Sequence, residues 1–191
     1  MIKNKLRITC LSGLLIFFSS SIGHSASPAK PEDGIHRFED SDITVVIGTR
    51  KPEQLAAFYT GRGFNQASID AITKKCFIFG MVDNKTFDTL WLILDDWKFY
   101  AADGSEMKRW KKSDWLGVWQ KTGLSPAHQS TFGWTQLPES RDLRRYEHVG
   151  GNVAVEWKDG PFKLVATLKT GTDKSGKPRI IVVENLTCKA K

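Results

Sequence analysis

Tryptophan and basic side chains gather in one short segment, residues 106–123, which reads EMKRWKKSDWLGVWQKTG. It contains three tryptophans and five of the chain's 28 basic residues. Indole rings next to positive charges can stack on sugars or lie at lipid headgroups, because each ring joins a large apolar face to a polar N–H. The candidate binding residues of this segment are Trp110, Trp115, Trp119, Lys108 and Lys112.

The spacing of these residues also fits a structural role. A helix over residues 106–121 places the three tryptophans on one broad face and the two lysines toward the other side. Such an amphipathic stripe is typical of a helix that packs on its own core, and Gly117 within it favours close approach to another backbone. We therefore expect core packing, and presentation of the tryptophans to a glycan or a membrane is the alternative.

A second basic group occurs in residues 141–148, RDLRRYEH, which bring Arg141, Arg144 and Arg145 close together. Guanidinium groups bind carboxylates and phosphates in pairs, so the group is a candidate anion site. Two acidic residues in the same segment offset its charge. We therefore favour a solvated connection between strands.

Catalytic residues are not indicated by any motif. No nucleophile-elbow glycine pattern surrounds a serine, and the adjacent Asp95 and Asp96 would face opposite sides of a strand. Residues 171–178, GTDKSGKP, lack the spacing of a phosphate-binding loop. We assign no catalytic residue, no metal ligand and no cofactor, and we expect a protein that is not an enzyme.

Cys76 and Cys188 predict one disulfide. Cysteines in even number are typical of exported chains, because free thiols seldom persist in oxidising compartments. Neither residue has a second cysteine or a histidine at the spacing of a metal site. Cys10 lies in the apolar N-terminal segment and is set aside.

Residues 1–26 have the pattern of a secretory signal peptide. A basic start precedes the apolar run ITCLSGLLIFF and a stretch of small residues. The run is shorter than the about 20 residues of a membrane-spanning helix, so we expect no transmembrane segment. Residues 27–41 contain two prolines, a glycine and many charges, and they predict a flexible leader. The expected location is the periplasm or the exterior of the cell.

The net charge limits the class of partner. The whole chain has 28 basic and 21 acidic residues, a net charge of +7. Removal of the predicted signal peptide takes away three basic residues and leaves 25 against 21, a net charge of +4. This charge is below that of a dedicated nucleic-acid-binding protein, but it permits contact with an anionic cell-surface polymer.

Residues 42–191 predict a single domain made mainly of β-strands. Strands are expected at 42–49, 76–82, 89–100, 151–157, 161–171 and 179–188, and helices at 52–60, 65–75 and 106–121. Turn residues predict two β-hairpins, one through residues 83–88 and one through Asp159 and Gly160. Strands with one apolar face are buried most simply in a two-sheet sandwich, with the helices as insertions at its edges or ends.

Two stretches carry a family resemblance: CFIFGMVDNKTFDTLWLILDDWKFYAADG and LPESRDLRRYEHVGGNVAVEWKDGPFKLVA. Over about the last 115 residues, their strand ends and turns resemble the immunoglobulin-like accessory domains of secreted bacterial proteins. The resemblance implies an immunoglobulin-like sandwich and an accessory role. It is a pattern of strands and not a catalytic signature.

A different resemblance lies in residues 44–64, TVVIGTRKPEQLAAFYTGRGF. This stretch looks like the opening of the glyoxalase and dioxygenase superfamily, which is built from βαβββ modules. The resemblance implies a divalent metal held by histidine and glutamate on strands. The available histidines are His36 in the leader and His128 and His148 in apparent loops.

These patterns predict an exported, non-catalytic binding or accessory protein of the bacterial periplasm or cell surface. The expected partner is another envelope protein or a cell-surface polymer, and nucleic acid is not expected. Two alternatives remain: a metal-dependent enzyme of the glyoxalase-like kind, and an envelope- or glycan-binding module that uses the tryptophan-rich helix.

Overall fold

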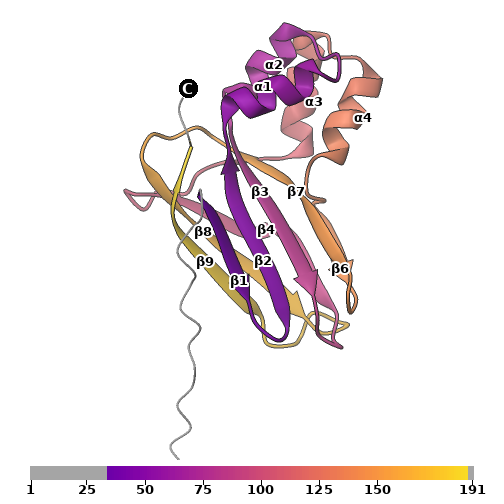
Figure 1. The fold of residues 1–191 in the computed structure, drawn as a ribbon, viewed down its shortest axis with the longest axis vertical. Coiled ribbons are helices and arrows are strands. Elements are labelled where there is room, and N and C mark those ends of the chain that lie inside the picture. The colour runs from indigo at the N-terminus through magenta and orange to yellow at the C-terminus, as the bar shows by residue number, and fades with distance from the viewer. Residues whose placement is uncertain (1–33, 189–191) are drawn as a thin grey trace, which may run out of the picture.

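Nine strands and four helices form within residues 34–188, the part of the chain that the computed structural model describes (Figure 1). The strands are β1 (Ile35–Glu39), β2 (Ile43–Arg50), β3 (Cys76–Asn84), β4 (Leu90–Ala101), β5 (Arg109–Trp110), β6 (Ser140–Leu143), β7 (His148–Val155), β8 (Pro161–Thr170) and β9 (Arg179–Thr187). The helices are α1 (Pro52–Thr60), α2 (Gln66–Thr73), α3 (Lys112–Thr122) and α4 (Pro126–Trp134). The predicted signal peptide and residues 27–33 lie outside the described residues. Within the described part, no helix is long and apolar enough to cross a membrane.

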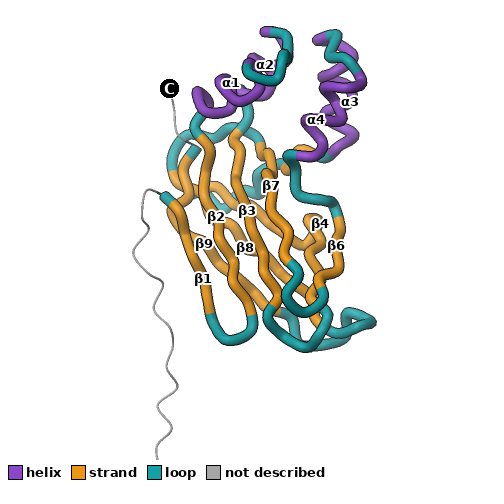
Figure 2. Tube along the Cα trace, turned by 45° about the vertical axis from the view of Figure 1, so that its right-hand side comes forward, coloured by secondary structure: helices purple, strands orange, loops and turns teal. Residues whose placement is uncertain are grey.

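The strands form two antiparallel sheets that face each other. Sheet A has the order β1-β2-β3-β7-β5, and sheet B has the order β6-β4-β8-β9. Figure 2 shows the two layers with the helices gathered at one end. Side chains that alternate along the strands fill the space between the sheets, as two antiparallel layers require. The prediction of a mainly β, two-sheet sandwich with short helical insertions is confirmed.

Both predicted hairpins are wrong. β3 pairs with β2 and β7 in sheet A, whereas β4 pairs with β6 and β8 in sheet B. The turn at Asp159 and Gly160 likewise joins β7 of sheet A to β8 of sheet B. Turn residues reverse the chain in both places, but a reversal between facing sheets uses the same residue types as a reversal within one sheet. The hairpins within one sheet are β1–β2, joined by residues 40–42, and β8–β9, joined by the longer loop 171–178.

The predicted leader contains a strand, which is a second correction. β1 pairs with β2 along its whole length and forms one edge of sheet A. Its residues alternate between exposed and half-buried, and Phe38 packs against the main core. The sequence IHRFE has the composition of a linker, because an edge strand buries few of its side chains. Its charged residues also keep the open edge from pairing with other strands. The folded domain therefore begins before the predicted start at Asp42.

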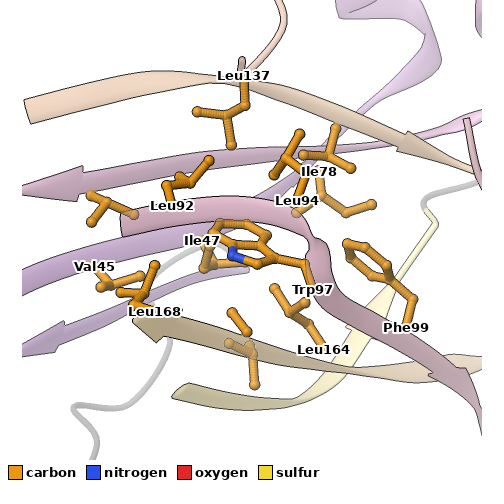
Figure 3. Close-up of a cluster of buried hydrophobic side chains, with 14 of the residues drawn as sticks. Val45, Ile47, Ile78, Leu92, Leu94, Trp97, Phe99, Leu137, Leu164 and Leu168 are labelled. Atoms are coloured by element: carbon orange, nitrogen blue, oxygen red, sulfur yellow. The ribbon is translucent and has the colours of Figure 1, made fainter. Parts of the chain in front are cut away.

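Trp97 lies at the centre of the main core, between the two sheets (Figure 3). Only 2% of this residue is exposed, and aliphatic side chains that include Ile47, Ile78 and Leu164 surround it. The pairing of β4 with β8 shifts between Leu92 and Trp97. Such an irregularity bends a strand and redirects its side chains, and here it brings a large indole into the aliphatic core.

Two glycines allow the chain to pass closely over sheet A. Gly80 of β3 and Gly151 of β7 are paired neighbours. A Cβ atom on Gly151 would lie 2.6 Å from the backbone nitrogen of Leu137, and one on Gly80 would lie 3.1 Å from Leu137 Cδ1. Glycine is therefore required at position 151, whereas a side chain at position 80 would press on that of Leu137. The crossing places Leu137, which is 4% exposed, in the main core.

The predicted disulfide between Cys76 and Cys188 is present, with Cα atoms 5.3 Å apart. Cys76 is the first residue of β3 in sheet A, and Cys188 directly follows β9 in sheet B. The bond therefore joins the two sheets covalently.

The four helices cover one end of the sandwich, and we call them the helical cap (Figure 1). Asn65 and Ser125 accept hydrogen bonds from backbone N–H groups at the starts of α2 and α4. Gly123, with a φ of 67°, ends α3. A second hydrophobic core lies between the cap and sheet A, and β3 and β7 each contribute one residue to it. Its buried members are Leu55, Tyr59, Phe64, Ile69, Ile72, Phe77, Trp115, Trp119, Leu124, Phe132 and Ala154.

The tryptophan-rich helix is shorter than predicted. α3 begins at Lys112, because Asp114 accepts a hydrogen bond from the Lys111 N–H at 2.8 Å and so caps the helix there. Arg109 and Trp110 lie before this cap and form β5, which pairs with β7. The helical spacing of Trp110 with the other tryptophans therefore does not reflect a continuous helix.

Candidate functional site

Aromatic rings of the helical cap pack into a continuous wall. Trp115 and Trp119 are stacked, with ring centroids 5.1 Å apart. The ring centroid of Phe132 in α4 lies 4.8 Å from that of Trp115, and the centroid of Trp110 lies 5.0 Å from it. Trp115 and Trp119 are 4% and 3% exposed, so the expectation that they pack in a core is confirmed. Rings buried to this extent are not presented to solvent for stacking on a glycan.

The other predicted residues of the segment take separate positions. Trp110 is half-buried, and its Nε1 donates a hydrogen bond to Glu156 Oε1 at 2.7 Å. Lys108 forms an ion pair with Asp114 at 3.0 Å. Lys112 is exposed at the first position of α3. The tryptophans therefore contribute to the interior of the cap, and these lysines lie toward solvent.

A cleft of about 740 Å³ lies between α3, α4 and the β5–β7 edge of sheet A. Small-molecule sites typically have volumes of roughly 300–1,000 Å³, and their linings are mostly apolar with a few polar groups. Large apolar side chains form much of this lining, among them Trp110, Trp115, Leu116, Trp119, Phe132 and Trp134. The buried aromatic wall is thus one side of a ligand-sized cleft.

Two apolar side chains of this lining are exposed. Trp134, the last residue of α4, is 85% exposed, and Leu116 of α3 is 47% exposed. Exposed apolar groups are informative where they adjoin a cavity, because such patches are typical of interaction sites. Neither residue belongs to a group that the sequence predicts as a binding site. Ser125 followed by Pro126 is a helix-start signal that could have located α4, but no sequence signal gives the exposure of Trp134.

One charged side chain of the cleft is almost fully buried. Arg109 has 8% of its side chain exposed, and its Nη2 contacts Asp95 Oδ1 and Glu139 Oε2, each at 2.7 Å. Asp95 also contacts Lys111 Nζ at 2.7 Å. Burial alone would lower the pKa of Arg109, but its bonds to Glu139 and Asp95 outweigh burial and raise it. Bonds from Lys111 and Arg109 lower the pKa of Asp95. Arg109 is therefore charged, and acidic neighbours balance its charge.

Three amide side chains, Gln129, Gln136 and Asn152, also line the cleft. Each uses its nitrogen within the protein. Gln129 donates to the Leu124 carbonyl at 2.8 Å, Gln136 to Thr135 Oγ1 at 2.8 Å, and Asn152 to the Thr135 carbonyl at 2.9 Å. Asn152 Oδ1 is buried and accepts no hydrogen bond from the described residues. These bonds hold the three amide side chains in fixed positions in the wall of the cleft.

The predicted arginine group lies at the other end of the sandwich. Arg141 is in β6, and Arg144 and Arg145 are in the turn between β6 and β7, away from the helical cap (Figure 1). Arg145 Cζ lies 3.4 Å from the ring centroid of Phe87 and 4.5 Å from that of Tyr146. None of the three arginines lines the cleft. The two predicted binding groups are therefore not one site.

The histidines considered as metal ligands lie on separate elements. His36 is in β1, His148 is the first residue of β7, and His128 is on α4, where it stacks on Phe64 at 5.0 Å between centroids. Within residues 34–188, no three His, Cys, Asp or Glu side chains are placed to hold a metal ion. The glyoxalase-like alternative thus has no ligand set in the described part of the chain.

Comparisons with known proteins give only distant similarities. The chain matches no protein-family model and no curated protein. A candidate lipoprotein (ycdA) from Bacillus subtilis subsp. subtilis str. 168 is 15% identical with a TM-score of 0.42, over 82% of this chain and 39% of that one. The yjhA protein from Bacillus subtilis is 8% identical with a TM-score of 0.38, over 68% of this chain and 76% of that one. This chain thus spans less than half the length of the first structure. Similarity at this level assigns neither a family nor a function.

Proposed function

We propose that this chain is an exported binding or accessory protein of the bacterial periplasm or cell surface, and that the cleft of the helical cap is its binding site. The cleft carries the proposal. It combines a ligand-sized volume, a wall of aromatic side chains, the exposed Trp134 and a buried guanidinium group on Arg109. This combination of an apolar lining with a few polar groups is typical of binding sites.

Two observations support export. Residues 1–26 have the charge and hydropathy pattern of a signal peptide. The Cys76–Cys188 bond fits an oxidising compartment, because cytosolic thiols are kept reduced. The proposed relation to immunoglobulin-like accessory domains is supported by the strand pattern of the sequence.

The ligand in this proposal is a small apolar compound, or an apolar group on an envelope protein or a cell-surface polymer. The exposed rings and side chains at the opening of the cleft would meet such a group first, and Trp134 is the largest of them. Burial of an exposed indole against a ligand removes apolar surface from water, which favours binding.

Binding of N-phenyl-1-naphthylamine tests the site, because this uncharged aromatic probe becomes fluorescent in an apolar environment. We expect saturable binding to the purified mature protein. Trp134→Ala should weaken it roughly three- to ten-fold, since an aromatic contact contributes about 0.5–1.5 kcal/mol. Phe87→Ala is the matched control, because Phe87 is 86% exposed and does not line the cleft. Absence of saturable binding, or equal loss in the two variants, would refute the cleft as the site.

A further inference from the structure

An exposed cluster of two aromatic rings and an arginine lies at the end of the sandwich opposite the helical cap. Its members are Phe87, in the loop between β3 and β4, and Arg145 and Tyr146, in the turn between β6 and β7 (Figure 1). We call them the loop-tip cluster, and we infer that it docks the protein on a bilayer that contains anionic lipids. None of the three residues lines the cleft, so the inference does not depend on the cleft as a binding site.

The two rings of the loop-tip cluster are almost bare. Phe87 is 86% exposed and Tyr146 is 68% exposed. A single exposed apolar side chain is ordinary, but two large rings that contact one arginine form a patch. A ring that projects this far meets a rigid protein surface with only part of its area, whereas lipid molecules can surround it. Aromatic side chains next to basic ones are typical of surfaces that lie at lipid headgroups.

Arg145 supplies a charge between bilayer and rings. Its Cζ lies 3.4 Å from the ring centroid of Phe87 and 4.5 Å from that of Tyr146. A guanidinium group that stacks through its face keeps the N–H groups on its edge available to an anion. Arg145 forms no ion pair within residues 34–188. A lipid phosphate is an acceptor of the kind that such a group binds.

The acidic residues of the same loops are not paired with this arginine. Glu147 Oε2 accepts a hydrogen bond from the backbone N–H of Arg144 at 2.9 Å, and Asp88 Oδ1 accepts one from the following backbone N–H at 2.8 Å. Arg144 is exposed, and like Arg145 it forms no ion pair in the described part of the chain. Both guanidinium groups can therefore meet an outside anion. The nearby carboxylates weaken the attraction, so we expect moderate binding that salt reduces.

Buried Asn84 holds the two loops in place. This residue is 0% exposed, and its Nδ2 donates hydrogen bonds to the carbonyls of Asp88 at 2.8 Å and Leu143 at 2.9 Å. Its backbone N–H donates to the Glu147 carbonyl at 3.0 Å, and its carbonyl accepts from the Tyr146 N–H at 2.6 Å. Tyr146 has a φ of 65°, which is uncommon for a residue with a Cβ atom. A surface fixed in this way loses less conformational freedom when it binds.

Co-sedimentation with lipid vesicles tests the inference on the oxidised mature protein. One set of vesicles consists of phosphatidylglycerol, which is anionic, and the other of phosphatidylcholine, which has no net charge. We expect binding to the phosphatidylglycerol vesicles that weakens as the salt concentration rises, and little binding to the phosphatidylcholine vesicles. Equal binding to the two kinds of vesicle, or binding to neither, would overturn the inference.

Two variants test whether the loop-tip cluster is the docking surface. Arg145→Gln should weaken binding to phosphatidylglycerol vesicles roughly five-fold, the contribution of one cation near an anionic surface. Phe87→Ala should weaken it roughly ten-fold, the lower end of the effect of burying a phenylalanine side chain. Both side chains are exposed, so the variants should unfold at the same urea concentration as the parent.

Two matched controls make the same changes at the other end of the molecule. Arg62→Gln removes an arginine that stacks on Phe58, with Cζ 3.3 Å from the ring centroid, between α1 and α2 of the helical cap. Trp134→Ala removes a ring that is 85% exposed at the end of α4. Both controls should bind the vesicles as the parent does. If they lose as much binding as Arg145→Gln and Phe87→Ala, the loop-tip cluster is not the docking surface.

A soluble anionic polymer separates a bilayer from other anions. Dextran sulfate carries negative charges but has no lipid interior. If the parent binds dextran sulfate as tightly as phosphatidylglycerol vesicles, and Phe87→Ala weakens neither, the arginines bind anions in general and the inferred bilayer is wrong. Failure of vesicle binding leaves the proposed function of the cleft standing, because N-phenyl-1-naphthylamine tests the cleft separately.

Discussion

Replacement of Trp115 by alanine tests the aromatic wall that supports both the helical cap and the cleft. The ring of Trp115 lies within 5.1 Å, centroid to centroid, of Trp110, Trp119 and Phe132, and the residue is 4% exposed. Trp115→Ala would therefore remove the ring that three other rings share. If the cap and the sandwich unfold together, the substitution should lower the free energy of unfolding of the whole domain.

The expected magnitude follows from burial. Truncation of a buried phenylalanine or tryptophan to alanine costs about 3–5 kcal/mol. Because Trp115 also lines the cleft, water can enter the space that it leaves, and we expect the lower part of that range, about 3–4 kcal/mol. For a chain of this size, 1 kcal/mol lowers the melting temperature by about 2–4 °C, so the variant should melt about 6–16 °C below the parent.

Urea denaturation, detected by near-ultraviolet circular dichroism, measures the loss in free energy of unfolding. Calorimetry measures the fall in melting temperature. Trp134→Ala is the control, because it removes an indole that is 85% exposed and should change the free energy of unfolding by no more than about 0.5 kcal/mol. If Trp115→Ala and the parent unfold at the same urea concentration, the aromatic wall does not stabilise the protein and our reasoning is refuted.

Three further predictions concern the sheets. Reduction of the Cys76–Cys188 bond should lower the free energy of unfolding by about 4–5 kcal/mol, the chain-entropy value for a loop of this length, and two free thiols in the denatured, unreduced protein would contradict the bond. A mature chain without β1 should unfold at a lower urea concentration than the full mature chain, because the edge of β2 and the site of Phe38 become exposed; equal midpoints would count against β1 as an integral strand. Bonds from Lys85 and Arg37 lower the pKa of Glu39 to about 2 from 4.5, so stability that is present above pH 4.5 should be lost as the pH falls toward 2. Glu39→Gln should flatten this part of the curve of stability against pH, and an unchanged curve would contradict the assignment.

The sequence located most strands but could not determine how they pair. Alternating residues and turn residues identified β3, β4, β7 and β8, because these patterns depend on which face of a strand is buried. They do not show whether the next strand continues the same sheet or crosses to the facing one. The glycines at 80 and 151 became interpretable only when the path of residues 135–137 over them was known.

Of the residues that line the cleft, the sequence correctly predicted the environment of the buried tryptophans. The apolar spacing of Trp115 and Trp119 correctly indicated a core face. The cleft also depends on Arg109, Trp134 and Glu139, which come from β5, from the end of α4 and from the segment before β6. Contacts between such distant segments arise from tertiary packing, and local periodicity contains no information about them.

The covalent link between the sheets also determines how the chain responds to mechanical tension. Cys76 and Cys188 close a loop that includes every strand from β3 to β9, so a force between the two ends of the oxidised chain passes through the sulfur atoms. Among the described elements, those from β1 to α2 precede this loop and can lengthen. The closed loop spans 112 positions, and an extended chain measures about 3.3–3.6 Å per residue. The disulfide therefore prevents an extension of roughly 370–400 Å. Tension therefore acts on the pairing of β1 with β2 and of β2 with β3, whereas the residues that line the cleft all belong to the closed loop, which the disulfide keeps from being extended.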